Sequence, residues 1–251
     1  MNTFEPGTFA PDPRRASTGA MVAAQARIES LLFLRHGEQQ LLSLVIPMGM
    51  LIALAHFPAI AGGSPITEVF PLTLATAAMS AGFTGQAIAV TFDRRYGALK
   101  RIGASGVPPW TIIFGKLVAV AIVSVIQTLI LGTTALILGW RAPLGGVLLG
   151  MLVLLLGVAT ATALGLLLGG TLGSDLVLPL ANLAWFALTG LAAYAIFANP
   201  PVSLVWVPSV ALAQGLMHAF HGGAPLLEIG VLAAWFVVSA FAASKLFKFT
   251  D

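Results

Sequence analysis

Cysteine is absent from the sequence, and charged residues are scarce. Twelve basic and nine acidic side chains make only 8% of the 251 residues charged, against about 25% in soluble domains. The absence of cysteine excludes disulfides, thiolate metal ligands and thiol nucleophiles. The scarcity of charge excludes an ordinary water-soluble enzyme, because so few ionic groups cannot cover a globule of this size. A hydrophobic fraction of 58% and a mean hydropathy of +0.98 are typical of a polytopic membrane protein.

Catalytic motifs are also missing. The sequence contains neither HExxH nor GxSxG, and Gly115-Lys116 is followed by leucine instead of the serine or threonine of a nucleotide-binding loop. His218 and His221 are spaced for one helical face but have no third ligand nearby, so we interpret them as interfacial residues and not as a metal site. We therefore predict no catalytic residue, no metal and no cofactor in this chain, and an intramembrane enzyme is disfavoured.

Long stretches without charge indicate the membrane topology. A membrane helix needs about 20 mostly apolar residues, and five uncharged intervals of 24 to 52 residues can each hold one. A sixth interval, between Glu228 and Lys245, contains only 16 residues. It can still hold a span, because the long side chain of the lysine can extend to the membrane interface. The sequence therefore predicts an all-α integral membrane protein with six transmembrane helices, at about 41–58, 67–92, 111–139, 145–170, 176–198 and 226–247. No charge falls at the centre of a predicted span, so an internal proton relay is disfavoured as the energy source.

The longest interval, between Asp175 and Glu228, contains 52 residues and could hold one helix or two. Its second half contains several prolines and a Gly-Gly pair, which a lipid-exposed helix tolerates poorly because the freed backbone groups need partners. We predict one span followed by an outer segment, 199–225, that dips back into the membrane before the last helix. Bends in this re-entrant segment are expected at Pro208, Gly222 and Gly223.

Eleven of the twelve lysines and arginines fall in three regions: the N-terminal 40 residues, the stretch from Arg94 to Lys116, and the C-terminus. Only Arg141 lies elsewhere. The positive-inside rule places the three basic regions in the cytoplasm. An even number of spans must then separate them, which six helices satisfy and seven do not. We expect a multi-pass protein of the plasma membrane with both termini in the cytoplasm.

The N-terminal part differs from the rest. Residues 1–19 contain three prolines and no apolar core, which predicts a flexible cytoplasmic tail and not a secretory signal. Residues 20–40 mix charged Arg27, Glu29 and Arg35 with apolar side chains, which favours a helix lying in the inner membrane interface. The alternative is a plain cytoplasmic extension of the first span. Residues 41–251 form the predicted transmembrane domain.

The loop from Phe92 to Lys116, FDRRYGALKRIGASGVPPWTIIFGK, contains five of the twelve basic residues. A short helix-compatible run from Gly97 to Ile102 is followed by glycines, and Pro-Pro-Trp then precedes the third span, as suits a helix start at the interface. The pattern predicts a short cytoplasmic docking helix between the second and third spans. The alternative is an anchor on anionic lipid, but an anchor needs only basic residues and neither the tyrosine nor the glycine spacing.

This loop resembles the first cytoplasmic loop of ABC-2 type transporter permeases. The family pattern is approximately acidic-Arg-x-x-Gly-Thr-Leu-x-Arg-Leu-x-Ala-Thr-Pro, followed by a tryptophan and a Gly-Lys pair. The matching residues are Asp93, Arg94, Gly97, Leu99, Arg101, Ala104, Trp110, Gly115 and Lys116, whereas Ala98 and Ser105-Gly106 depart from the pattern. The likeness extends to the chain length and the six-span architecture, and it is strongest to exporters of the daunorubicin-resistance type.

The resemblance implies a permease without ATPase activity. It implies two permeases, identical or paralogous, paired with two ABC ATPase subunits that bind ATP and magnesium, and contact with membrane lipid but not with nucleic acid. It also implies that the loop helix docks on the ATPase and transmits its closure. The implied coupling residues are Asp93, Arg94, Arg95, Tyr96, Gly97, Leu99, Lys100 and Arg101, with support from Arg27, Glu29 and Arg35.

The cargo is less well determined by the sequence. Gln86, Gln127 and Asn182 are the polar residues that could line a path, although such residues more often bond neighbouring helices. The apolar interior favours an amphiphilic or lipophilic compound. The alternatives are a polysaccharide, a glycolipid or a haem-related cargo, and, outside transport, a membrane assembly subunit with no path. The glycine pairs Gly146–Gly150 and Gly165–Gly169 are expected to pack helices within one subunit.

Overall fold

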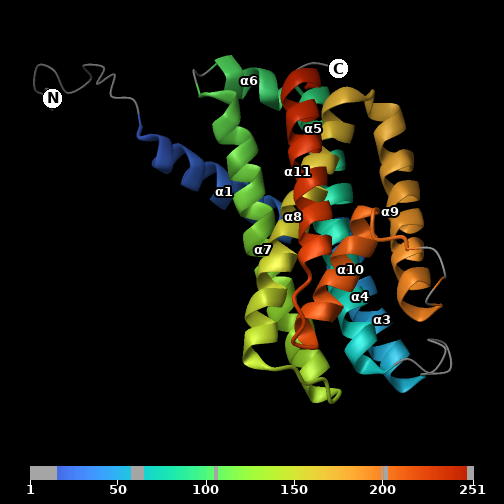
Figure 1. Cartoon of the computed structure of the whole chain (residues 1–251). Helices are drawn as coiled ribbons and strands as arrows, with labels where there is room; N and C mark the ends of the chain where they lie inside the picture. Colours follow the sequence, from blue (N-terminus) through green and yellow to red (C-terminus); the bar gives the residue numbers. More distant parts are fainter. Residues whose placement is uncertain (1–15, 58–64, 105–106, 199, 201–202, 248–251) are drawn as a thin grey trace, which may run out of the picture.

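The structure, a computed structural model, describes residues 16–57, 65–104, 107–198, 200 and 203–247. All regular structure in this part of the chain is helical. Most of the long helices run side by side, whereas the first helix leaves the bundle at an angle (Figure 1). The helices are α1 (Thr18–Arg35), α2 (Gly37–Gln40), α3 (Ile46–His56), α4 (Ile66–Met79), α5 (Gly85–Arg95), α6 (Ala98–Ala104), α7 (Pro109–Ile137), α8 (Leu144–Thr171), α9 (Ser174–Phe197), α10 (Pro208–Phe220) and α11 (Leu226–Leu246), with π-helical turns η1 (Leu41–Val45) and η3 (Ser80–Thr84).

Five helices are long and apolar enough to cross a membrane. They are Ile66–Arg95, which joins α4, η3 and α5, then Trp110–Ile137, Leu144–Thr171, Ser174–Phe197 and Leu226–Leu246. The first predicted span, 41–58, corresponds to a shorter apolar helix, Leu41–His56, and position 58 lies outside the described residues. The described part of the chain thus contains five candidate spans by length, and the sixth stays a prediction.

The helix formed by α4, η3 and α5 is the central element. Its most apolar window is 83% buried inside the protein, against 22% for α9. The hydroxyls of Thr73, Thr76 and Thr91 donate to the carbonyls of Val69, Leu72 and Ala87 within the same helix. These three hydroxyls can therefore lie in apolar surroundings without leaving a donor unpaired.

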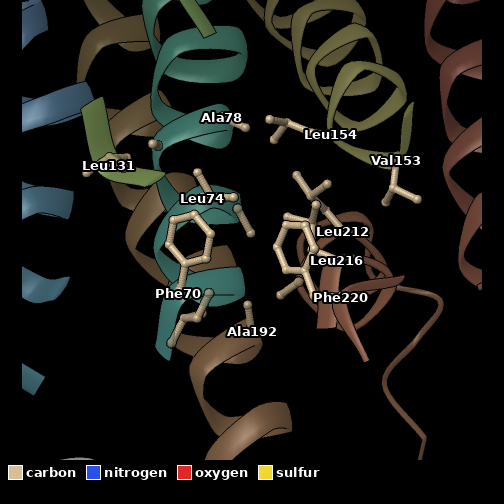
Figure 2. Packing of buried hydrophobic residues seen from close by; sticks show 14 of the residues in the cluster. Phe70, Leu74, Ala78, Leu131, Val153, Leu154, Ala192, Leu212, Leu216 and Phe220 are labelled. Atoms are coloured by element: carbon tan, nitrogen blue, oxygen red, sulfur yellow. The ribbon is translucent and has the colours of Figure 1, made fainter. Parts of the chain in front are cut away.

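The main core forms where α4 meets α8 and α10. Figure 2 shows Phe70, Leu74 and Ala78 of α4 facing side chains of α8 and α10. Phe70 packs edge-on against Trp140 at 4.6 Å between ring centroids and parallel to Phe220 at 5.8 Å. Trp140 lies in the connection between α7 and α8, and this connection is at the end of the bundle away from α6 (Figure 1). The core therefore holds α10 between the long helices there.

Helix α8 packs through glycines. A Cβ at Gly165 would overlap the carbonyl oxygen of Phe83, and one at Gly169 would overlap that of Ala87, both on the central helix. A Cβ at Gly150 would overlap the ring of Phe220 on α10. The predicted packing of both glycine pairs within one subunit is therefore confirmed, because the neighbours are elements of the same chain.

Helix α10 is a buried 13-residue helix that contacts α4, α8, α9 and α11. It lies in the half of the bundle away from α6 (Figure 1). Pro208 begins it, and Gly222, with φ +83°, ends the turn that follows. Two of the predicted bends thus coincide with its ends, with Gly223 adjacent. Re-entry into the membrane stays a prediction, and residues 199 and 201–202 lie outside the described residues.

Candidate functional site at the charged end of the bundle

Most of the ionic side chains gather at one end of the bundle, where α5 and α11 end and α6 lies (Figure 1). We call this the charged end. It contains the loop that the sequence singled out, from Asp93 to Lys116. Three features make up the site here: a buried lysine, a short basic helix, and an arginine that joins two spans.

Lys116 is the centre of a buried ion cluster. Its Nζ lies 2.6 Å from Oε1 of Glu29 and 2.8 Å from Oδ2 of Asp93, and its side chain is only 2% exposed. The three residues, which we call the Lys116 cluster, come from α7, α1 and α5. A buried ammonium needs such partners because leaving water costs it several kcal/mol. The cluster therefore holds the first helix to both helices that flank the loop.

Helix α1 also approaches α7 closely beside this cluster. A Cβ at Gly115 would overlap the side chain of Gln25, so glycine is required for this contact. The Nε2 atom of Gln25 donates to Oε1 of Glu29 at 2.8 Å and orients that carboxylate toward the lysine. Arg27 and Arg35, expected to support coupling with Glu29, are exposed on α1.

Helix α6 is seated on the bundle by Leu99, beside which Ile102 packs on the same apolar cluster. Leu99 is 2% exposed and packs with Val90, Ile112 and Leu166. Gly97, with φ +68°, makes the turn from α5 that this seating requires, since other residues rarely adopt that conformation. The other side of α6 carries the exposed Lys100 and Arg101. The helix thus has a buried apolar anchor and a basic outer surface.

The side chain of Tyr96 begins this outer surface. It is 67% exposed and stacks on Phe92 with 6.0 Å between ring centroids. Its carbonyl accepts a hydrogen bond from Nη2 of Arg101 at 3.2 Å. Arg95 is exposed and lies 3.7 Å from Oδ1 of Asp175, across the end of α9.

Arg94 is placed differently from the neighbouring basic residues. Its side chain is buried, and its Nη1 donates to the carbonyls of Gly169 and Leu172 at 2.7 Å each. These carbonyls belong to the last turn of α8, where helix groups lack internal partners and a cation is favourable. Arg94 joins the central helix to α8 and does not lie on the outer surface with Lys100 and Arg101.

A family model described as "ABC-2 family transporter protein" matches residues 66–245. The chain belongs to this family. No curated protein matches the chain. The matched range begins at α4 and ends within α11, so it includes the central helix, α6 and all but the first helices of the bundle.

As an ABC-2 transporter chain, the protein is a membrane-embedded transport component and not itself a catalyst. Permeases of this family normally work with an ABC ATPase. The resemblance drawn from the loop sequence is thus confirmed for the family.

Among the described residues, no three potential metal ligands lie together. His218 pairs with Glu228 at 2.7 Å, and His221 bonds the Met217 carbonyl.

The three polar residues proposed for a path in this ABC-2 chain do not share one cavity. Gln86 lines a cavity of about 290 Å³ between α1 and α5. Gln127 lines a much smaller one between α4, α7 and α8, beside Leu154. Asn182 lies partly exposed on α9 and lines neither. A path through all three stays a prediction.

Sequence reasoning missed Lys116 as the organising residue of the site. It noted the lysine only as part of the Gly-Lys pair at the start of a span. The available signal was a single cation in a long apolar stretch, which demands a buried carboxylate partner. Gln39 was also missed: its Nε2 donates to the Ser80 carbonyl at 3.3 Å, and Gly85 leaves space for it.

Proposed function

We propose that the chain is the permease subunit of an ATP-driven exporter that moves an amphiphilic or lipophilic compound out of the cytoplasm or inner leaflet. It works as one of two permease copies or paralogues with two ABC ATPase subunits, which supply ATP and magnesium chemistry. The observation that carries the proposal is α6, a basic helix seated by Leu99 at the charged end of an ABC-2 chain.

The proposed topology has six spans with both ends in the cytoplasm, the shorter Leu41–His56 being the first. Ile66–Arg95 contains 30 residues, or about 45 Å of helix, against a hydrocarbon core of about 30 Å. The central helix therefore extends beyond the core at the charged end. Gln39 contacts this helix at Ser80, and α3 then packs along α4 toward the opposite end. Ser80 is near the middle of Ile66–Arg95, so Leu41–His56 starts at that level, and the proposal takes it as a first span that runs from there to the outer side.

The contacts of α6 explain how closure of the ATPase subunits is transmitted to the membrane helices. Leu99 connects it to α5, α7 and α8, and the Lys116 cluster connects the same region to α1. When ATP draws the two ATPase subunits together, a docked α6 moves with its ATPase and carries the ends of these spans. The permease halves then tilt and open outward. The buried α10, which begins at Pro208 and is followed by the turn at Gly222, closes the outer side before that step.

The interior favours an apolar cargo over a hydrated one. A cavity of about 210 Å³ between α4, α7 and α8 is lined by residues such as Leu74, Gly132 and Met151. Such a mostly apolar surface offers few hydrogen bonds to a polysaccharide in place of water. Glycolipid and haem-related compounds stay open as alternatives, and so does the likeness to daunorubicin-resistance exporters.

The test of coupling is charge reversal on α6. We expect the Arg101→Glu variant to reach the membrane at the wild-type level. The ABC ATPase should no longer co-purify with it, and efflux should be lost as a consequence. A broken charge pair at a buried interface costs roughly 2–5 kcal/mol, which corresponds to at least about a 30-fold weaker complex. Co-purification and efflux are measured on the same membranes.

Lys245→Glu is the matched control, because Lys245 is an exposed cation at the same end, on α11. It makes the same charge change without touching α6, so ATPase binding and efflux should persist. Normal ATPase binding and efflux in Arg101→Glu combined with Lys100→Glu would show that α6 only contacts anionic lipid. Purification of a wild-type complex with no ATPase would favour the membrane assembly subunit.

A further inference from the structure

The cavity between α1 and α5 has the composition of a ligand site. Its volume of about 290 Å³ is close to the lower end of the roughly 300–1,000 Å³ that ligand pockets occupy. Apolar Leu32, Phe33 and Phe92 form part of its wall, together with polar and acidic side chains. Gln86 lies 20 residues after Ile66 on the central helix, about 30 Å along its axis. In the proposed topology Ile66 is at the outer interface, so this distance equals the thickness of the hydrocarbon core and places the cavity at the inner interface, where an amphiphile enters.

The cavity lining has a net negative charge. Glu29 and Asp93 both contribute to it, and no lysine or arginine does so among the described residues. Within the described part of the chain, Lys116 is the ammonium that pairs with these carboxylates, so one negative charge remains. His36 also lines the cavity, and its Nδ1 accepts a hydrogen bond from the Gln39 backbone N–H at 3.3 Å.

Three side chains of the lining have an unused hydrogen-bond acceptor. Gln86 is only 3% exposed, and its Oε1 accepts no hydrogen bond from the described part of the chain. Glu29 uses Oε1 for Lys116 and Gln25, and Asp93 uses Oδ2 for Lys116. The second oxygen of each carboxylate has no partner among the described residues. The amide oxygen of Gln86 is buried without a donor, which is costly, whereas the carboxylates of Glu29 and Asp93 lie on side chains that are 13% and 33% exposed. All three can accept hydrogen bonds from a ligand that supplies donors.

We propose that this cavity binds a primary ammonium on an apolar body, as the entry site for the cargo. The inference rests on the proposed function and narrows its cargo to amphiphilic monocations. A primary ammonium has three N–H donors, which match the three free acceptors, and its charge matches the unpaired negative charge. The apolar body of the ligand packs on Leu32, Phe33 and Phe92.

The test is equilibrium binding of radiolabelled dodecylammonium to the purified full chain in phosphatidylcholine nanodiscs, corrected for empty nanodiscs. We expect saturable binding that dodecyl sulfate does not compete for. Dodecyltrimethylammonium has the charge but no N–H, so it should bind about tenfold or more weakly. Gln86→Met should lower the affinity for dodecylammonium by about tenfold, the worth of one hydrogen bond from a charged donor.

Gln127→Met is the matched control, because Gln127 is an equally buried glutamine that lines a different cavity. It should bind dodecylammonium as the wild type does. Equal affinity in the wild type and Gln86→Met, or equal affinity for the two cations, overturns the proposal. If Gln86→Met does not fold, Ala89→Leu serves instead: Ala89 lines the cavity and is partly exposed, so leucine should fill it and abolish binding, and retained binding overturns the site.

These measurements need no ATPase, so the two proposals can fail separately. Binding without any ATPase-dependent efflux of the amine would refute the exporter but not the site. ATP-driven efflux of other compounds without amine binding would refute the site but leave the exporter standing.

Discussion

At the scale of single residues, the Lys116 cluster balances two opposing terms. Burying an ammonium and two carboxylates removes their hydration, and their mutual attraction offsets this only while all three remain. Lys116 is almost fully enclosed, whereas the side chain of Asp93 is 33% exposed. Water therefore screens part of the cluster on the Asp93 side. The lysine is the partner whose loss leaves the most charge unbalanced.

We expect Lys116→Met to destabilise the protein by about 3 kcal/mol, because it leaves two carboxylates close together without their cation. The measurement is the midpoint of thermal unfolding of the purified chain in detergent. Adding Glu29→Gln and Asp93→Asn to Lys116→Met removes both stranded charges and should recover most of the loss. An unchanged midpoint in Lys116→Met alone would show that the cluster does not hold α1 in place.

The loop composition indicated a charged site, but not the direction of each side chain. Arg94 and Arg101 look alike in the sequence, as basic residues of one loop. The structure buries Arg94 against the last carbonyls of α8 and leaves Arg101 exposed. The difference depends on where α8 ends in space, about 75 residues later in the chain, which no local pattern contains. For this reason Arg94→Glu would disturb the packing of α8 and does not serve as a test of docking.

At the scale of helices, charge-free intervals predicted most boundaries to within a few residues. The span predicted at 145–170 is Leu144–Thr171, and the one at 226–247 is Leu226–Leu246. The second span was predicted to stop at 92 because Asp93 begins a charged run. The helix continues to Arg95, since buried partners accommodate Asp93 and Arg94, and the glycine turn after Tyr96 ends it. The π-helical turns and the shorter first helix depend on packing and were not predicted.

At this scale we predict that the glycines of α8 are required for its close packing on the central helix. Gly169→Ala should destabilise the protein by about 1–3 kcal/mol, because the added methyl overlaps a backbone carbonyl of the central helix that cannot move alone. Gly190→Ala on α9 is the control, since nothing lies within 4 Å of its Cβ position and alanine is the better helix former by about 1 kcal/mol. Thermal unfolding midpoints should therefore shift in opposite directions. A Gly169→Ala midpoint equal to that of the wild type would contradict the close packing of α5 on α8.

At the scale of the whole molecule, one ion cluster constrains the topology. Glu29 on α1 and Asp93 at the end of α5 bind the same lysine. Glu29, six residues before the end of α1, and the end of the central span therefore lie at the same level of the bundle. The chain between them must leave this level and return along Ile66–Arg95. Gln39 already lies beside Ser80 near the middle of the central helix, so Leu41–His56 has only the remaining part of the way to the opposite end to cover.

The last prediction tests that topology directly. Because the sequence has no cysteine, single cysteines can be introduced without background at three exposed sites: Thr18 before the first span, Ala104 at the end of α6, and His221 after α10. In sealed membranes, an impermeant maleimide added from outside should label only His221→Cys, because the basic regions face the cytoplasm. Thr18→Cys and Ala104→Cys should react only after the membranes are opened. Labelling of Thr18→Cys from outside, with Ala104→Cys protected, would mean that Leu41–His56 does not cross and that the bundle has five spans. Labelling of Ala104→Cys from outside would reverse the orientation and remove the proposed contact between α6 and a cytoplasmic ATPase.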